Sequence, residues 1–154
     1  MTARITDVDR GLNRMAAVLA KHVRVRVGVL ADEPKKESEG GASLLEVAAV
    51  HEFGAPAAGI PQRSFIRGTV DEKLPEIHAL QASQARRILT GNVTPEIAVE
   101  QIGMRVKGFI QQRISAGIEP PLADSTIERK NGKTTPLIDT GQLRTSIAYQ
   151  VEKA

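Results

Sequence analysis

The sequence predicts an α+β fold in a single domain that spans residues 1–154. Two segments near opposite ends of the chain, VRVRVGVL and SIAYQVE, alternate apolar and polar residues as half-buried strands do. Between them, long segments repeat apolar residues at three- and four-residue steps, which is typical of helices. A chain of 154 residues, 41% of them hydrophobic, is long enough for one apolar core. We therefore expect a small antiparallel sheet that pairs the N-terminal and C-terminal strands, packed by two or three longer helices.

The first expected element is an amphipathic helix, and the first strand follows it. Apolar residues at helical spacing predict the helix from about residue 5 to 21: Ile5, Val8, Leu12, Met15, Ala16 and Leu19. The period then changes to two, because the valines from 23 to 29 alternate with Arg24, Arg26 and Gly28. This strand should place its arginines on a solvated or interface face.

A charged loop separates this strand from a short helix. The loop, at about residues 31–42, mixes opposite charges with Pro34 and two glycines, so it cannot bury enough apolar surface to offset its ordering entropy. We expect it to be mobile. Ser43 and Glu46 then have the spacing of a capping box ahead of LLEVAAVHEF, and Gly54 is a suitable helix terminator.

An irregular stretch leads into the first long helix. Residues 55–62 have no period and contain two prolines, and the following SFIRG is expected to be a short extended piece. Thr69 and Glu72 have capping-box spacing, which predicts a helix from about 70 to 89. Its apolar face is thin, so we expect it to lean on a neighbour, either within the chain or in another subunit.

The second long helix is expected to be the main core helix. Thr94 and Pro95 occupy favoured cap and first-turn positions, and Gly117 marks the end. The apolar stripe of this helix is clear: Val99, Ile102, Val106, Phe109, Ile110 and Ile114.

The C-terminal part is expected to hold two short helical pieces and the closing strand. Ser125 and Glu128 have capping-box spacing at the start of one or two helical turns, and Asp139 and Gln142 repeat that spacing in DTGQL. The closing strand has three apolar residues on one face: Ile147, Tyr149 and Val151. Pairing it with the first strand would join both ends of the chain in one sheet.

Composition narrows the classes of function. The chain has no cysteine, which excludes disulfides, thiolate metal sites and a cysteine nucleophile. No stretch approaches the roughly 18 uninterrupted apolar residues of a membrane span, and the N-terminus lacks the apolar region of a signal peptide, so we expect no membrane association. A net charge of +3, spread along the chain, is too modest to predict specific nucleic-acid binding.

Candidate catalytic and metal-binding motifs fail on spacing. His51 and Glu52 lack a second histidine four residues away, so they do not form a zinc metalloprotease helix, and we expect them to make helix caps or packing contacts. The glycine patterns of dinucleotide-binding and phosphate-binding loops are absent, and no serine lies in a nucleophile elbow. We therefore expect no catalytic residue, no metal and no cofactor, and a protein that is not an enzyme.

Several short motifs occur in a fixed order: AAVHEFG, IPQRSFIR, a long helical middle, PPLADSTIERK and PLIDTGQLRTSIAYQV. This order resembles the tail-completion or neck proteins of long-tailed bacteriophages, including the virion morphogenesis proteins of Mu-like phages, over about residues 23–152. The matching positions are His51, Glu52, Phe53, Gly54, Ile60, Pro61, Arg63, Phe65, Arg67, Pro121, Leu122, Thr126, Ile127, Lys130, Leu137, Asp139, Thr140, Gly141, Leu143, Ser146 and Ile147. Ser64 departs from the pattern, in which proline is frequent, and this departure leaves the rigidity of the turn open.

The resemblance implies a structural virion protein. Such a protein forms a ring at the head-proximal end of the tail, the neck, and joins the tail to the head connector. A closed ring of about six copies is implied, with about twelve as the less expected count. Its partners would be the tail tube or tail terminator protein and the head-tail connector or stopper, and DNA would pass through the lumen without specific binding. The protein would be found in the virion, and in the host cytoplasm during assembly.

In that role, the stretch from 50 to 69 is expected to be a structural joint or an interface. Phe53 and Phe65 bracket a turn stiffened by prolines and should pin it to the core, while Arg63 and Arg67 should pair with carboxylates within or across subunits. The candidate interface or structural residues are His51, Glu52, Phe53, Gly54, Pro61, Arg63, Phe65, Arg67, Asp139, Thr140, Gly141 and Leu143.

A second interpretation stays open, that of a small basic phage-encoded protein associated with DNA. Its phosphate contacts would come from Arg24, Arg26, Arg86, Arg87, Arg129, Lys130 and Lys133. Salt dependence separates the two interpretations, because phosphate contacts weaken steeply with salt and a ring held by apolar packing does not.

Overall fold

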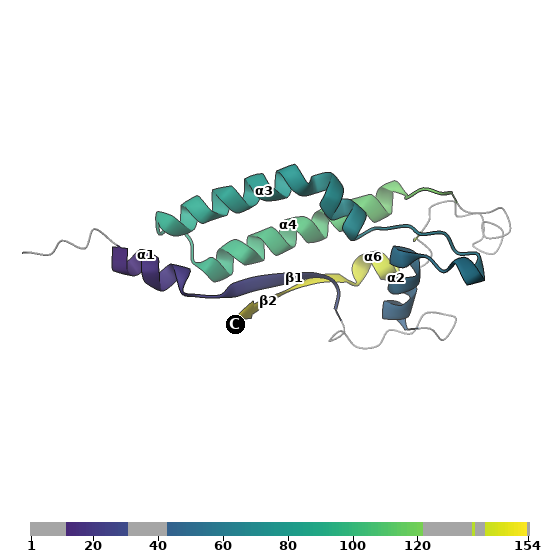
Figure 1. Ribbon diagram of the computed structural model, residues 1–154, viewed down its shortest axis with the longest axis horizontal. Helices are drawn as coiled ribbons and strands as arrows, with labels where there is room; N and C mark the ends of the chain where they lie inside the picture. The colour runs from purple at the N-terminus through teal and green to yellow at the C-terminus, as the bar shows by residue number, and fades with distance from the viewer. Residues whose placement is uncertain (1–11, 31–42, 122–136, 138–140, 154) are drawn as a thin grey trace, which may run out of the picture.

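The structure is an elongated α+β domain with a two-stranded sheet on one side and two long helices on the other (Figure 1). The computed structural model describes residues 12–30, 43–121, 137 and 141–153. Its elements are α1 (Leu12–Leu19), β1 (Val23–Val29), α2 (Leu44–Phe53), the 3-10 turn η1 (Pro56–Ala58), α3 (Arg67–Leu89), α4 (Pro95–Ala116), α6 (Gln142–Thr145) and β2 (Ile147–Lys153). The helix α4 lies between the sheet and α3, so the body has three tiers.

The sheet joins the two ends of the chain, as the sequence predicts. β1 and β2 pair antiparallel without a bulge, from Val23 opposite Lys153 to Val29 opposite Ile147. Burial alternates along β1, and Arg24 and Arg26 are exposed on the outer face. Both arginines form ion pairs with Glu152 on the neighbouring strand, so this cationic face is partly neutralised within the chain.

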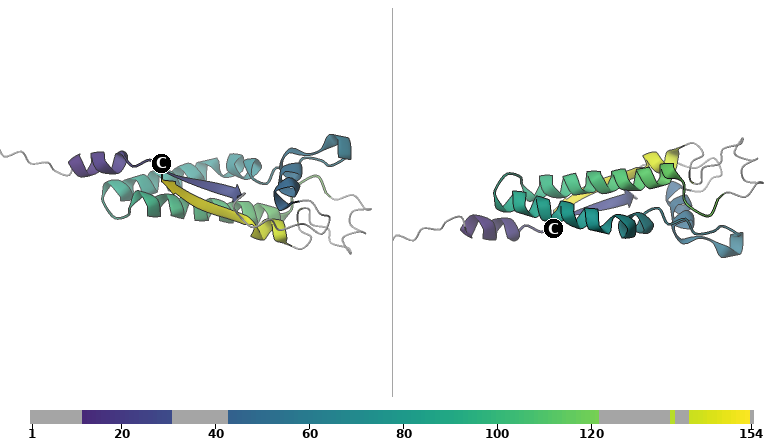
Figure 2. Two further views of the ribbon diagram at one scale, coloured as in Figure 1. Left: turned by 90° about the horizontal axis from the view of Figure 1, so that it is seen from below. Right: turned by 90° about the horizontal axis from the view of Figure 1, so that it is seen from above.

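The helix α4 supplies the centre of the core and confirms the predicted stripe from Val106 to Ile114, while Val99 and Ile102 are half-buried. It starts at Pro95 behind the Thr94 cap, whose Oγ1 accepts the N–H of Ile97 at 3.3 Å, and it packs on both strands and on α3. Figure 2 shows α4 running alongside α3, with the strands beneath the helices. The core cluster comprises Leu44, Ala48, Phe65, Ile77, Val106, Phe109, Ile110, Ile114, Ile118, Leu137, Leu143 and Ile147.

One glycine allows the close approach of α4 to the sheet. A Cβ atom on Gly103 would lie 2.5 Å from Val25 Cγ2 and 3.2 Å from Tyr149 Cβ, one residue from each strand. Atoms at 2.5 Å overlap, so only a residue without a side chain fits between these two.

The helix α3 begins earlier than the sequence predicts, and the proposed cap at Thr69 and Glu72 is wrong. Helical structure starts at Arg67, so SFIRG is not an extended piece throughout. Thr69 is buried inside the helix, and its hydroxyl donates to the Phe65 carbonyl at 2.5 Å. The apolar face is thin, as expected, and the helix leans on α4 of the same chain. Buried Gln84 takes part in this packing and donates to Gln101 at 2.9 Å.

Three shorter elements complete the comparison with the sequence. The capping box of α2 is confirmed, because Ser43 and Glu46 bond reciprocally, and Gly54 ends the helix at a φ of 77°. Gln142 is the first residue of α6 and Gly141 precedes it, while Asp139, on which the expected cap depends, lies outside the described residues. The N-terminal helix ends at Leu19, not at about 21.

Some expectations concern residues outside the described part of the chain. These are the start of the N-terminal helix, the mobile loop at about 31–42, the helical turn from Ser125 to Glu128, and residues Asp139 and Thr140. Among the described helices, none combines the length and the apolarity that crossing a membrane requires.

Candidate functional site

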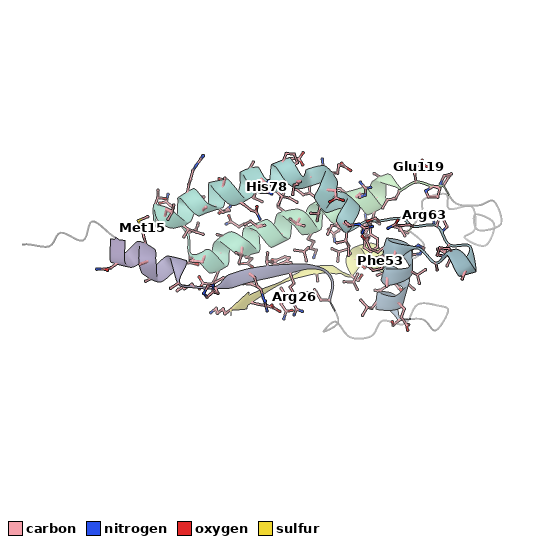
Figure 3. The ribbon with its side chains drawn as sticks, viewed as in Figure 1. Met15, Arg26, Phe53, Arg63, His78 and Glu119 are labelled. Atoms are coloured by element: carbon pink, nitrogen blue, oxygen red, sulfur yellow. The ribbon has the colours of Figure 1, made fainter. Side chains whose placement is uncertain are left out.

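The end of α2 and the start of α3 meet at one end of the molecule, and most of the motif residues that the structure describes gather there. Figure 3 labels Phe53, Arg63 and Glu119 at this end and Met15 of α1 at the opposite end. Where α2 ends and α3 begins, Glu52 and residues 64–67 form a hydrogen-bonded cluster, which we call the Glu52 junction.

The Glu52 carboxylate caps α3 from another helix. Oε2 accepts the backbone N–H of Phe65 at 2.8 Å and of Ile66 at 2.9 Å, and Oε1 accepts that of Arg67 at 3.0 Å. Glu52 is only 6% exposed, and these bonds satisfy N–H groups at a helix start that have no partner inside the helix. A negative charge at a helix N-terminus is also stabilised by the helix dipole.

Ser64 completes the cap at the position where the resembled pattern often has proline. Its hydroxyl donates to Glu52 Oε1 at 2.6 Å and accepts the N–H of Gly68 at 3.0 Å. Hydrogen bonding therefore holds this turn in place without a proline ring.

An arginine of α4 ties the junction to the core helix. Arg113 Nε donates to the Ser64 carbonyl at 3.2 Å, and its guanidinium pairs with Glu72 of α3. No feature of the sequence predicted this role for Arg113. Ser64 lies 49 residues and Glu72 lies 41 residues before it in the chain, and no local spacing indicates either contact.

Arg63 is a buried structural residue, which corrects the expectation that it pairs with a carboxylate. Its side chain donates to the backbone carbonyls of Pro120 at 2.9 Å and Pro121 at 3.1 Å, and the residue is 5% exposed. Burial lowers the pKa of the Arg63 guanidinium, and the nearby Glu119 carboxylate partly opposes this shift. The bonds from Arg63 link the IPQRSFIR motif to the PPL motif, far along the chain.

The two phenylalanines of the motif have opposite environments. Phe65 is 0% exposed within the core, as expected, but Phe53 is 69% exposed, so the expectation that it pins the turn is wrong. The reason is its position at the last turn of α2, on the face directed away from the core. Arg67 is also exposed, and its backbone N–H, not its side chain, makes the bond to Glu52.

An apolar groove lies beside the junction, and we call it the Leu45–Phe53 groove. It has a volume of about 390 Å³, and six apolar residues line it: Val29, Leu45, Ala48, Ala49, Phe53 and Ile66. Glu52 and Arg67 also line it. It is therefore bounded by β1, α2 and the start of α3.

The remaining motif residues are distributed around this end. The His51 carbonyl accepts the N–H of Arg63 at 2.7 Å, and Pro61 is exposed. A Cβ atom on Gly54 would lie 3.0 Å from the Gln62 nitrogen, so this position needs glycine for space as well as for its positive φ. Leu143 lies in the core, and Gly141 caps α6.

The contacts of the motif residues at this site join one segment of the chain to another. Within the described residues, no three side chains of His, Asp or Glu lie together as metal ligands. The basic residues of the DNA interpretation are partly occupied: Arg24 and Arg26 pair with Glu152, and Arg87 donates to Gln84 and Gln101. Arg86 is exposed, while Arg129, Lys130 and Lys133 lie outside the described residues.

The chain was compared with protein-family models, curated proteins and solved structures. No protein-family model, curated protein or solved structure matches the chain.

Proposed function

We propose that this protein is a structural subunit of a phage neck, a ring at the head-proximal end of the tail that joins the tail to the head connector. The proposal starts from the ordered motifs of the sequence, which resemble tail-completion proteins. Partners on the two sides of the ring would be the tail tube or tail terminator and the head-tail connector or stopper.

One observation carries the proposal further: motifs far apart in the chain bond to one another as scaffolding. Glu52 of the first motif caps the helix that follows the second, and Arg63 of the second binds the backbone of the third. Leu143 and Ile147 of the fourth lie in the same core cluster as Phe65. These contacts join distant segments of the chain to one another, which supports a structural role for the motif residues.

The proposal is tested on particles of a phage that encodes this chain. An epitope tag on the chain, located by gold labelling in electron microscopy, should mark the junction between head and tail. A nonsense mutation in the gene should give separate full heads and separate tails, and supplying the chain from a plasmid should rejoin them. Label elsewhere on the particle, or intact particles from the nonsense mutant, would overturn the proposal.

The DNA interpretation predicts a different result with the purified chain. Binding to a random duplex should weaken by orders of magnitude between low and physiological salt if phosphate contacts dominate. The engagement of Arg24, Arg26 and Arg87 within the chain makes this the weaker candidate.

A further inference from the structure

The Leu45–Phe53 groove is an apolar surface to which the described part of the chain supplies no cover. Leu45 is 47% exposed and Phe53 is 69% exposed on the same short helix, and both line the groove. Apolar side chains of this size at the edge of a groove are typical of a site for an amphipathic helix.

The groove carries one cationic side chain, which limits what it can bind. Arg67 lines it and is exposed. The only carboxylate in the lining, that of Glu52, is occupied by three backbone N–H groups and the Ser64 hydroxyl. The complementary partner is therefore an apolar helix face with a carboxylate beside it.

The N-terminal segment of the chain has this chemistry. Apolar residues recur at helical spacing in the sequence at Ile5, Val8, Leu12, Met15, Ala16 and Leu19. Asp7 and Asp9 flank Val8 and provide acidic groups, and Arg10 and Arg14 lie further along the same segment. Recognition of a helix in a groove uses anchors at i, i+3, i+4 and i+7, which this spacing supplies.

In its own chain, the described part of this segment, α1, lies away from the groove. Lys21 contacts Glu96 at 3.5 Å, so the end of α1 lies near the N-terminus of α4. The groove lies at the other end of the body, where Val29 ends β1 and Arg67 begins α3. The helix α1 leads further away from the groove (Figure 1).

Met15 of α1 and Phe53 of the groove lie at opposite ends of the molecule (Figure 3). With α1 in this position, the groove that the segment can enter is that of another copy.

We propose that the N-terminal segment, residues 5–19, of one copy binds in the Leu45–Phe53 groove of the next copy, with Asp7 and Asp9 directed toward Arg67. Donor segment and acceptor groove lie at opposite ends of each subunit, so the contact is head-to-tail. Repeated contacts of this kind close into a ring when the rotation per subunit allows it. This contact deepens the proposed function, because its closure into a ring rests on the proposal that the protein is a neck subunit.

Disulfide trapping in the full chain tests the contact directly, because the native sequence has no cysteine. Val8→Cys is introduced in one preparation and Leu45→Cys in a second, mass-labelled preparation, and the two are mixed at high micromolar concentration under mild oxidation. A covalent heterodimer is the expected product. Met104→Cys is the matched control acceptor, since Met104 is 56% exposed but lies on α4 outside the groove.

A charge swap tests the polar part of the contact. Arg67→Glu should weaken self-association, measured by sedimentation velocity, by roughly tenfold. Adding Asp7→Arg and Asp9→Arg to the same chain should restore it. A circular dichroism spectrum equal to that of the wild type shows that each variant is folded.

Four results would overturn the proposal. In the first, the chain stays monomeric and forms no disulfide between copies. In the second, the Met104→Cys control is trapped as efficiently as Leu45→Cys; in the third, a chain that carries both Val8→Cys and Leu45→Cys forms the disulfide within itself. In the fourth, Asp7→Arg and Asp9→Arg do not restore the self-association lost in Arg67→Glu. These results leave the neck assignment intact if gold labelling still marks the head-tail junction. Conversely, successful trapping with label elsewhere supports the contact and rejects the neck.

Discussion

The Glu52 carboxylate lies 2.8 Å from the backbone nitrogen of Phe65, which is thirteen residues further along the chain. This bond and its neighbours hold two helices end to end. They make Glu52 a buried acid whose charge faces only donors.

The first prediction is that Glu52→Gln lowers the free energy of unfolding by roughly 2–4 kcal/mol, measured by urea denaturation. The amide removes the charge from the cap and turns an NH₂ group toward backbone N–H groups. Glu46→Gln is the matched control in the same helix and should cost less than about 1 kcal/mol, because glutamine also completes capping boxes. Equal losses in the two variants would contradict the role of Glu52.

The second prediction compares two glycines of α4. Gly103→Ala should destabilise the fold by roughly 1–3 kcal/mol, because its Cβ atom would overlap Val25. Gly108→Ala has no neighbour within 4 Å of its Cβ atom, so it should stabilise the fold by up to about 1 kcal/mol through helix propensity. Thermal unfolding of both variants measures the difference, and stabilisation by both would show that α4 does not press on the sheet at Gly103.

The third prediction separates the two phenylalanines of the motif. Phe65→Ala should cost about 3–5 kcal/mol, because Phe65 is fully buried. Phe53→Ala should change stability by less than about 0.5 kcal/mol, because its ring is largely exposed. Chemical denaturation of both variants is the measurement. A large loss in Phe53→Ala would mean that Phe53 is covered within the isolated subunit.

The fourth prediction separates the two arginines. Arg63→Met leaves two buried carbonyls without their donor and should cost roughly 2–3 kcal/mol. Arg67→Met should be within about 0.5 kcal/mol of the wild type, because that side chain is exposed. If Arg63→Met unfolds at the same urea concentration as Arg67→Met, the link between the second and third motifs contributes little.

Residue spacing correctly predicted the elements whose burial depends only on neighbouring positions in the chain. The period-two alternation of β1 and the stripe of α4 each depend on one face being buried, so burial follows directly from spacing. The pairing of β1 with β2 was also predicted, because each of these half-buried strands needs a partner and each can serve as the other's.

The errors have a common physical cause in contacts between distant residues. Thr69 and Glu72 have the spacing of a cap, but Glu52 supplies the cap from another helix, so α3 starts about three residues earlier, at Arg67. Arg63 was expected to find a carboxylate, yet backbone carbonyls of a distant segment accept its bonds.

A residue's type did not predict its environment at two further positions. Phe53 is apolar and was expected in the core, but it lies at the surface end of α2. Gly103 gave no signal in the sequence, because the need for glycine arises only where α4 meets the sheet. Both features follow from how elements are placed relative to one another, which spacing along the chain does not record.

The pairing of the first and last strands has a consequence for synthesis on the ribosome. Arg24 meets Glu152 from 128 residues away, so the sheet cannot form until β2 has left the exit tunnel. The α3–α4 hairpin is local and is synthesised earlier, so we expect it to form first, with its sheet-facing apolar side uncovered. Emergence of β2 is therefore the step that closes the domain, and a nascent chain stalled before that step would stay open to chaperones.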